Sequence, residues 1–519
     1  MFSKTGIVKH MSALTILLPA VIAAPALAAA WAFGPGRRTP RVTGKVGAAV
    51  AAAGVAGAVA LAAGIRDTTV STALGPIGFT ADRLAVVLLI LVFGVSAIAQ
   101  SFAVRYLAGD PRAAWFSAGA GLLTAASAGL VTAGTLIGLA LCWTIAGVAL
   151  CLLLATYRQL PAARDGVRRT AVAFLIGDAA LWIAVGLATA AWGPVELSAL
   201  GADRISGPLV PVVAILIVVA ALSRSAQIPF HRWLPATLAA PTPVSALLHA
   251  GVVNAGGILL IRLAPLTADD LARLLVVIAG AATMVYGATV MLVKPDIKGA
   301  LVHSTTAQMG FMILTCGLGL WIATVVHLVA HGFYKATLFL SSGSAIATFR
   351  RSRAVPPVRR LDVRQTVVHG LTAVCLPALA LGLGLAVSPG SASSPAGPAG
   401  ENVLLVFAWI TGAAATWGWL QRRPGLTGAL SGAALLTPAT VAYVAGIHAI
   451  GGYLAPALPQ STLPATAVWA ALGATLAILG LIAAARRLPG TGGFQLALYS
   501  RALSAGHIPA PPTMAGASS

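Results

Sequence analysis

The stretch Trp321–Ala345, WIATVVHLVAHGFYKATLFLSSGSA, is long enough to cross a bilayer as a helix, yet it carries three titratable side chains. His327, His331 and Lys335 are spaced so that they project from one helical face, as a column about 12 Å long. A lysine near the centre of a spanning helix costs about 2.5 to 3.5 kcal/mol on insertion scales, so it is kept where it faces protein, water or an opposite charge. We therefore interpret the column as part of a proton or cation path.

Each of these side chains also has a purely structural interpretation. Lys335 could extend to a membrane interface or form a quiet ion pair inside the helix bundle. A lone buried histidine is usually a hydrogen-bonded core residue. The central position of Lys335, and the register that His327 and His331 share with it, favour the path.

The composition is typical of a polytopic helical membrane protein. Of the 519 residues, 58% are hydrophobic and only 9% are charged, and the mean hydropathy is +0.92. The apolar segments predict an all-α fold of about 15 transmembrane helices, within a range of roughly 13 to 16. We interpret the first, from about residue 11, as an uncleaved helix rather than a signal peptide, because its apolar run is long and further helices follow. The cysteines show no metal-ligand spacing, so we expect no metal site and no disulfide.

The net charge of +21 is unevenly placed along the chain. If successive loops alternate between the two faces of the membrane, most of the 33 Lys and Arg residues fall on one face. The excess of basic residues marks that face as cytoplasmic, which makes the N-terminus external, the C-terminus cytoplasmic and the bilayer itself a partner. The loop Arg350–Arg364 is then cytoplasmic and the linker Ser388–Gly400 external. Because the charge lies in membrane loops, we expect no nucleic-acid partner.

The segment Ser223–His249, SRSAQIPFHRWLPATLAAPTPVSALLH, contains prolines that cannot all sit in straight helices. We predict that the seventh helix, over 208–230, is broken, and that the eighth begins at the PTP turn and continues to about residue 263. Broken helices are tolerated in membranes where the freed backbone lines a cavity, which is where transporters place ion sites. Arg224 enters the break and His249 lies about one turn inside the next helix, although Arg224 could instead be a cytoplasmic anchor.

Two further polar features lie at membrane depth. Asp178 is the one acid clearly inside a spanning segment, as either a structural partner of Arg224 or a relay acid. The run Lys294–Gly310, KPDIKGALVHSTTAQMG, begins as a solvated turn with a helix cap. His303 and the hydroxyl and amide side chains that follow it then offer a water-lined entry toward the column.

Three blocks of the sequence resemble the signature blocks of the antiporter-like proton-translocating subunits of respiratory complex I and the Mrp cation/proton antiporters. They are SAQIPFHRWLPATLAAPTPVSALLHAGVVNAGGILLIR, DIKGALVHSTTAQMGFM and HLVAHGFYKATLFLSSGS, within a match from about Phe79 to Ser344. The resemblance implies that Lys335 is the central proton-carrying lysine and that His331 and His327 are its neighbours on the water path. It also implies that His249 is the histidine of the eighth helix, and that Arg224 occupies the position of the seventh-helix lysine.

The chain departs from the family pattern in three respects. In the pumps the tryptophan of the fifth helix is followed by a glutamate, whereas here Trp143 is followed by Thr144. Arg224 cannot release its proton at any usual pH, and no later lysine lies at membrane depth after residue 365. We therefore expect Arg224 to act as a fixed charge that holds Asp178 ionised and biases the protonation of Lys335, so that Arg224→Ala raises the pH optimum.

This pattern, the chain length and the ending ALYSRALSAGHI resemble one branch of the family, the membrane subunits of two-component inorganic carbon pumps. The resemblance implies a bacterial plasma-membrane protein that is no enzyme, holds no cofactor, and conducts protons or another cation such as sodium. The energy would drive a DabA-like, zinc-containing cytoplasmic subunit that hydrates carbon dioxide. Alternatives are a proton-pumping subunit of a complex I-like NADH-quinone oxidoreductase or hydrogenase, an Mrp-type sodium/proton antiporter subunit, and an inert scaffold.

The same considerations divide the chain into four parts. We expect N-terminal transmembrane helices over 1–78, the antiporter-like core over 79–347 and C-terminal transmembrane helices over 348–488. Residues 489–519 are expected to form a cytoplasmic tail that is partly disordered.

Overall fold

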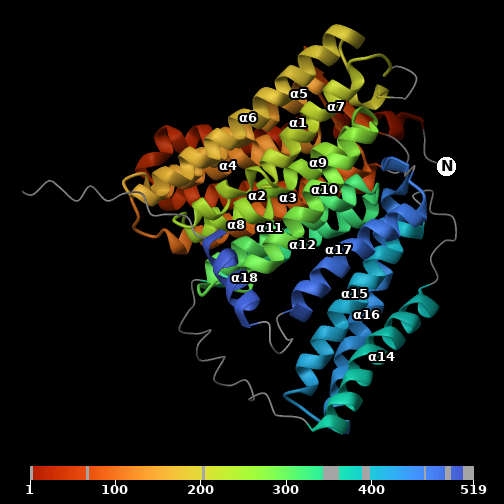
Figure 1. The fold of residues 1–519 in the computed structure, drawn as a ribbon. Coiled ribbons are helices and arrows are strands. Elements are labelled where there is room, and N and C mark those ends of the chain that lie inside the picture. The colour runs from red at the N-terminus through yellow and green to blue at the C-terminus, as the bar shows by residue number, and fades with distance from the viewer. Residues whose placement is uncertain are drawn as a thin grey trace, which may run out of the picture. The chain divides into compact units, whose positions relative to one another are not determined.

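The computed structural model describes residues 4–65, 69–200, 205–342, 362–388, 398–460, 463–485 and 492–505. Most of this part of the chain is helical (Figure 1). The α-helices are α1 (Lys4–Phe33), α2 (Pro40–Gly64), α3 (Arg83–Tyr106), α4 (Ala113–Val131), α5 (Leu136–Leu154), α6 (Pro161–Trp192), α7 (Val210–Arg224), α8 (Thr242–Ala250), α9 (Ala255–Arg262), α10 (Asp270–Met291), α11 (Ile297–Gly317), α12 (Trp321–Ser341), α14 (Val363–Val387), α15 (Pro398–Leu420), α16 (Leu426–Leu454), α17 (Ala465–Ala485) and α18 (Gly492–Ala505).

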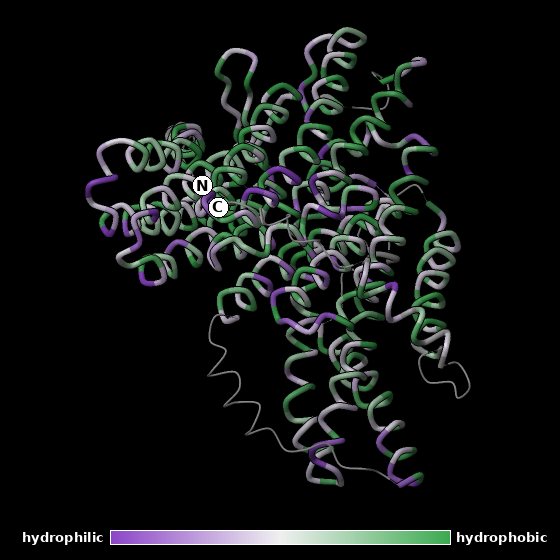
Figure 2. The backbone as a smooth tube through the Cα atoms, turned by 60° about the vertical axis from the view of Figure 1, so that its left-hand side comes forward, coloured by the Kyte–Doolittle hydropathy of each residue, from purple (hydrophilic) through white to green (hydrophobic). Residues whose placement is uncertain are grey.

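The predicted class, an all-α membrane protein, is confirmed. Within the described residues, 13 segments are long and apolar enough to cross a membrane, at the lower end of the predicted range. Two expected spans are not among them: α7 is short because it ends at Arg224, and α11 carries the polar run that follows His303. Figure 2 shows apolar residues along most of the helices, with polar residues mainly in the turns and at helix ends.

The chain forms two compact units. The first contains α1 to α11, the part of α12 from His327 onward, α17 from Thr466, and α18. In it α2 packs on α3, α1 on α4, α4 on α5, α6 on α7, and α10 on α11. The second unit contains Gly319–Val326, which includes the beginning of α12 at Trp321, together with α14, α15 and α16. In it α14 packs against α15 and α16. The four-part division by sequence stays a prediction.

A β-hairpin and a C-terminal helix are the elements that the sequence analysis missed. The strand β1 (Val70–Leu74) pairs antiparallel with β2 (Ile77–Ala81), and Gly75 in the turn has a positive φ of 62°. The strands are too short for their alternation to stand out from the surrounding apolar sequence. Within the predicted tail over 489–519, α18 occupies Gly492–Ala505; the part expected to be disordered, beyond α18, lies outside the described residues, so that expectation stays a prediction.

The predicted break within the seventh span, over 208–230, is present. The chain leaves α7 at Arg224 and passes through two 3-10 turns, η4 (Phe230–Trp233) and η5 (Pro235–Thr237), before α8 begins at Thr242. Side chains satisfy backbone carbonyls that the break frees: Trp233 Nε1 donates to Ser223 O at 3.0 Å, and Gln227 Nε2 donates to Ser225 O at 2.7 Å.

The eighth span is also broken, where one continuous helix was expected. It ends as an α-helix at Ala250 and resumes at Ala255 after a 3-10 turn, η6 (Val252–Asn254). Asn254 Nδ2 donates to Ala250 O at 2.8 Å, and Ser225 Oγ donates to Val253 O at 2.7 Å. This second break occurs at Gly251 and contains no proline. A single glycine marks a helix end less strongly than a proline does, which is why the sequence did not reveal the break.

Glycines bring α10 and α11 into backbone contact. A Cβ added to Gly280 would lie 2.9 Å from Gly310 O, and one added to Gly310 would lie 2.8 Å from Gly280 O. Small residues at such positions let two membrane helices pack closely. The contact fixes α11, which carries the polar residues that face α12.

Candidate functional site

Lys335 lies on α12 with its side chain fully buried. Its ammonium group donates to Ser304 Oγ at 2.8 Å and lies 3.4 Å from Leu301 O, both on α11. Among the described residues no carboxylate lies within ion-pair distance of Lys335. This ammonium is held by a hydroxyl and a carbonyl and has no fixed counter-charge. It therefore gives up less interaction energy when it releases its proton than an ammonium in a salt bridge does.

His331 lies one turn before Lys335 and contacts α11 and α8 through its two ring nitrogens. Nδ1 lies 2.7 Å from Gln308 Oε1, and Nε2 lies 3.1 Å from the carbonyl oxygen of His249. A carbonyl only accepts, so Nε2 must carry a proton in this arrangement. Gln308 can then donate to a neutral ring through its amide nitrogen, or accept from a charged ring through its oxygen.

The break between α8 and α9 brings His249 to the column. Its imidazole stacks on Phe339, one turn after Lys335, with ring centroids 4.2 Å apart and an interplanar angle of 8°. Its carbonyl lies near the end of α8, where it accepts from His331. His249 is buried, and the described residues provide no hydrogen-bond partner for its Nδ1.

The column continues to His327. The rings of His327 and His331 have centroids 5.6 Å apart, and His327 also meets the edge of Phe311 at 5.0 Å. His327 Nε2 is buried and has no hydrogen-bond partner among the described residues. Unpaired buried nitrogens at such positions are groups that ordered water usually satisfies.

His303 lies on α11, next to Ser304, but its ring faces α10. Its ring approaches Tyr286 of α10 with centroids 6.2 Å apart, and Tyr286 in turn meets His231 at 4.7 Å. His231 belongs to the turn after the broken seventh helix. The sequence analysis singled out neither His231 nor Tyr286; the HRW tripeptide in a proline-rich break was the available signal.

A second polar cluster joins α5, α6 and α7. Arg224 NH2 lies 2.8 Å from Asp178 Oδ1, and Arg224 NH1 donates to the backbone oxygen of Trp143 at 3.1 Å. Trp143 Nε1 donates to the same carboxylate oxygen at 2.8 Å. The guanidinium carbon lies 4.4 Å from the centroid of Trp143 and 4.1 Å from that of Phe174, so the cation is enclosed between two rings. Arg224 is buried, and the predicted proximity of Arg224 and Asp178 is confirmed as a contact.

Thr144 lies outside this ion pair. Its hydroxyl accepts from Trp182 Nε1 at 3.0 Å, one helical turn along α6 from Asp178. Trp143 and Thr144 therefore bind successive turns of α6, and Trp143 rather than Thr144 contacts the charged residues.

The structure thus groups the predicted residues into two clusters. His249, His327, His331 and Lys335 come together around α12, while Asp178 and Arg224 form the ion pair. Ser304 and Gln308 are direct partners of the column whose individual contacts could not be read from the sequence, because α11 offers several polar side chains. Within the described residues no three metal-ligating side chains gather into a cation site.

The clusters lie in the part of the chain that matches known proteins. Residues 133–388 match the family model described as NADH:quinone oxidoreductase/Mrp antiporter, TM, and residues 70–117 match the N-terminal domain of chain 5 of NADH-ubiquinone oxidoreductase (complex I). The chain therefore contains the antiporter-like membrane domains that these two family models describe.

Within that family, the chain is similar to subunits named DabB. It is 35% identical over 352 residues to the probable inorganic carbon transporter subunit DabB1 of Halothiobacillus neapolitanus, covering 64% of this chain and 62% of that one. It is 35% identical over 291 residues to the probable inorganic carbon transporter subunit DabB of Bacillus subtilis, covering 54% and 56%. Subunit L of the NADH-quinone oxidoreductase of Mycobacterium tuberculosis is 34% identical over 275 residues, covering 52% and 43%. The matches thus span about half to three fifths of the DabB relatives' length.

Solved structures share the fold. The Mrp complex from Dietzia sp. gives a TM-score of 0.62 at 23% identity, over 94% of this chain and 59% of that one. The membrane-bound sulfane sulfur reductase, an archaeal respiratory membrane complex, gives 0.57 at 16% identity, over 94% and 99%.

Proposed function

We propose that this chain is the membrane subunit of an energy-coupled inorganic carbon pump, and that it conducts protons or another cation to drive a DabA-like partner. The observation that carries the proposal is Lys335, a buried ammonium without a carboxylate partner among the described residues, at the end of a histidine column. The similarity to DabB subunits supports the substrate, carbon dioxide or bicarbonate. Hydration chemistry would lie in the zinc-containing cytoplasmic partner, and this chain itself would be no enzyme.

The proposed route uses the order of residues along α12. In the orientation derived from the basic loops, α12 begins at the external face, so His327 lies nearer the outside than Lys335. Protons then pass from His327 to His331 and Lys335. They leave toward Ser304, His303, Tyr286 and His231 on the cytoplasmic side.

A second candidate is a proton-pumping subunit of a complex I-like oxidoreductase, which the similarity to subunit L supports. Arg224 favours the carbon pump. It occupies the position of the seventh-helix lysine of the proton pumps, and a guanidinium cannot take part in a cycle of proton release and uptake there.

The two candidates can be separated in cells. The chain should be expressed with and without a DabA-like subunit, and uptake of radiolabelled inorganic carbon measured before and after an uncoupler collapses the proton gradient. We expect uptake that needs both chains and disappears with the gradient. Uptake that is independent of this chain, together with NADH-driven proton pumping that requires it, would support the oxidoreductase subunit instead.

A further inference from the structure

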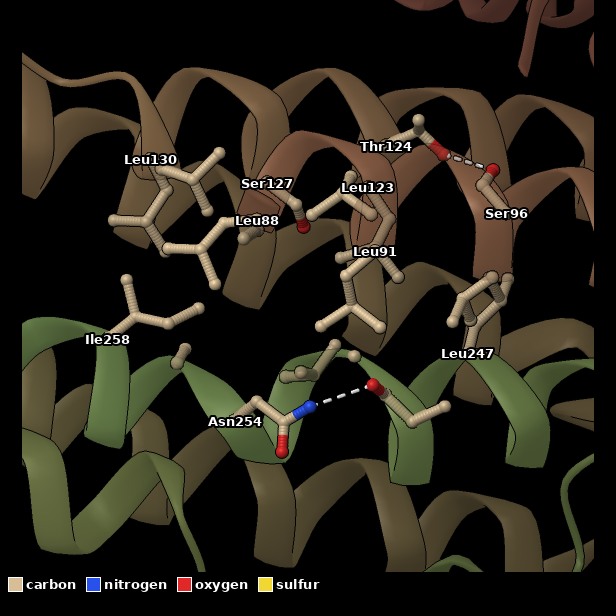
Figure 3. Close-up of a pocket in the computed structure, with 18 of the residues that line it drawn as sticks. Leu88, Leu91, Ser96, Leu123, Thr124, Ser127, Leu130, Leu247, Asn254 and Ile258 are labelled. Atoms are coloured by element: carbon tan, nitrogen blue, oxygen red, sulfur yellow. Dashed lines mark hydrogen bonds between the residues drawn. The ribbon is translucent and has the colours of Figure 1, made fainter. Parts of the chain in front are cut away.

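The first unit contains apolar side chains that its own helices cover and others that they leave exposed. Inside the bundle, Leu88 of α3 and Leu130 of α4 lie around a small cavity and are at most 4% exposed (Figure 3). The helix α18 instead exposes Leu496, Tyr499 and Leu503, by 69%, 49% and 37%. These three side chains recur at intervals of three and four residues, so they form one apolar stripe along the helix.

The other sides of α18 have different surroundings. α18 packs against α10, and Ala502 is 7% exposed, so Ala502 marks the side of the helix that faces the protein. Ser500, Arg501 and Ser504 are exposed on a third side, turned away from the stripe. The helix therefore has an apolar stripe, a polar side and a side held by the protein.

The position of α18 in the chain keeps it close to the membrane. Seven residue steps join Ala485 at the end of α17 to Gly492 at the start of α18, a distance of at most about 25 Å even in a fully extended chain. α17 is one of the segments apolar enough to span, so α18 begins within that distance of the bilayer face at which α17 ends. With 14 residues, a length of about 21 Å, α18 is itself too short to cross a hydrocarbon core of about 30 Å.

The charge and the neighbours of α18 suit a lipid surface. Residues 486–519 include three arginines and no acidic residue, and anionic lipids attract basic segments that follow a spanning helix. The protein contact of α18 is with α10, which is also a spanning segment. The apolar surface next to the stripe is therefore the lipid that surrounds α10.

We propose that α18 lies in the headgroup region of the bilayer, with Leu496, Tyr499 and Leu503 inserted toward the lipid tails and Arg501 facing water. This face is cytoplasmic in the orientation derived from the basic loops. Helices with an apolar stripe, a polar side and basic charge bind membranes in this manner. Tyr499 suits the boundary, because its ring is apolar and its hydroxyl stays hydrated. The anchor is independent of the cation that the protein conducts and of the histidine column.

The test measures the surroundings of α18 with a nitroxide spin label at single cysteines. The full chain is reconstituted in liposomes of phosphatidylethanolamine and phosphatidylglycerol. The label's collision rates are measured with oxygen, which concentrates in hydrocarbon, and with the nickel chelate of ethylenediaminediacetate, which stays in water. Tyr499→Cys and Leu503→Cys report on the stripe, and the matched controls are Ser500→Cys and Ser504→Cys, each one residue further along the helix. In the cysteine-free background, alanine replaces Cys142, Cys151, Cys316 and Cys375.

We expect the ratio of the oxygen rate to the nickel rate to be about tenfold higher at Tyr499→Cys and Leu503→Cys than at the two serine positions, as for labels several Å below the headgroups. Adding Leu496→Asn and Leu503→Asn should lower the ratio at Tyr499→Cys to that at Ser500→Cys, in a protein whose gel-filtration profile is unchanged.

Three results would overturn the anchor. Equal ratios at the stripe and at the serines would place the stripe in water. Low collision rates with both reagents at Tyr499→Cys and Leu503→Cys would show that protein covers the stripe. An unchanged ratio at Tyr499→Cys in the presence of the two asparagine substitutions would show that the leucines do not hold the helix in the lipid.

Discussion

The carboxylate of Asp178 on α6 lies 2.8 Å from the guanidinium of Arg224 at the end of α7, and Trp143 of α5 is bonded to both. The negative charge beside the seventh helix thus comes from Asp178 on α6, because Thr144 on α5 carries no charge. An arginine enclosed by two rings and a carboxylate is a permanent charge, and Asp178 offsets most of its field at longer range. The pair is therefore suited to a fixed electrostatic role.

Breaking this pair from one side should be costly. Arg224→Ala leaves the largely buried Asp178 without its opposite charge and with only the Trp143 hydrogen bond, and we expect it to lower the free energy of unfolding by about 3 to 5 kcal/mol. The double variant Arg224→Gln with Asp178→Asn should lose less, because it removes both charges. Thermal unfolding in detergent compares them, with Arg168→Ala as the control, since Arg168 pairs with Asp165 at an exposed site worth about 0 to 1 kcal/mol. A double variant as unstable as the single one would contradict the pair's role.

Arg224→Lys should preserve most transport, because a lysine retains the charge beside Asp178. The sequence suggested that Arg224→Ala would raise the pH optimum, but the close carboxylate leads us to expect only a small upward shift. Flux measured against pH in reconstituted vesicles decides this. A large shift would mean that the guanidinium acts on Lys335 despite its partner.

Lys335→Ala should abolish gradient-driven flux while the protein remains inserted in the membrane. A neutral stub cannot hold a proton between His331 and Ser304, the groups on either side of it. The adjacent Tyr334→Ala is the control, because Tyr334 is 56% exposed on the outer surface of the helix. Proton uptake by proteoliposomes, followed with an internal pH dye, gives the rate; wild-type flux in Lys335→Ala would remove Lys335 from the path.

The sequence predicted the column well because its register follows from helix geometry alone. His327, His331 and Lys335 share a face whatever surrounds them, and the prolines after Arg224 require a break. The partners of the column could not be predicted in the same way. Ser304 and Gln308 are selected from several polar residues by how α11 packs on α12, and the release of the His249 carbonyl depends on a break that no proline marks.

The orientation of the chain can be tested with single cysteines in the cysteine-free background. We predict that Ser352→Cys, in the most basic loop, is labelled by an impermeant maleimide only in inside-out vesicles. Ser391→Cys, in the linker after α14, should be labelled only from the outside. Both positions lie outside the described residues, so the prediction rests on the charge distribution. Labelling of Ser352→Cys from the external face would reverse the direction of the proposed route.

Gln308 should assist proton transfer through His331. Nε2 of His331 is committed to donating to the carbonyl of His249, so protonation changes only Nδ1, which faces the Gln308 amide at 2.7 Å. When the Gln308 amide rotates by half a turn, it presents either its nitrogen, which donates to the neutral ring, or its oxygen, which accepts from the charged ring. Gln308→Leu removes this partner, a loss of about 1.5 to 3 kcal/mol for a charged hydrogen bond, and we expect flux to fall about ten- to a hundredfold.

The control for Gln308 is Thr306→Val on the same helix, because the Thr306 hydroxyl bonds only to the Val302 carbonyl of its own helix among the described residues. Gln308→Glu should also slow transport, since a carboxylate beside His331 favours the charged ring and hinders release of its proton. The two variants should differ in their pH profiles: Gln308→Leu should be slow at every pH, whereas Gln308→Glu should recover as rising pH favours proton release. Normal flux in Gln308→Leu would show that His331 changes protonation without the amide, or does not change it during transport.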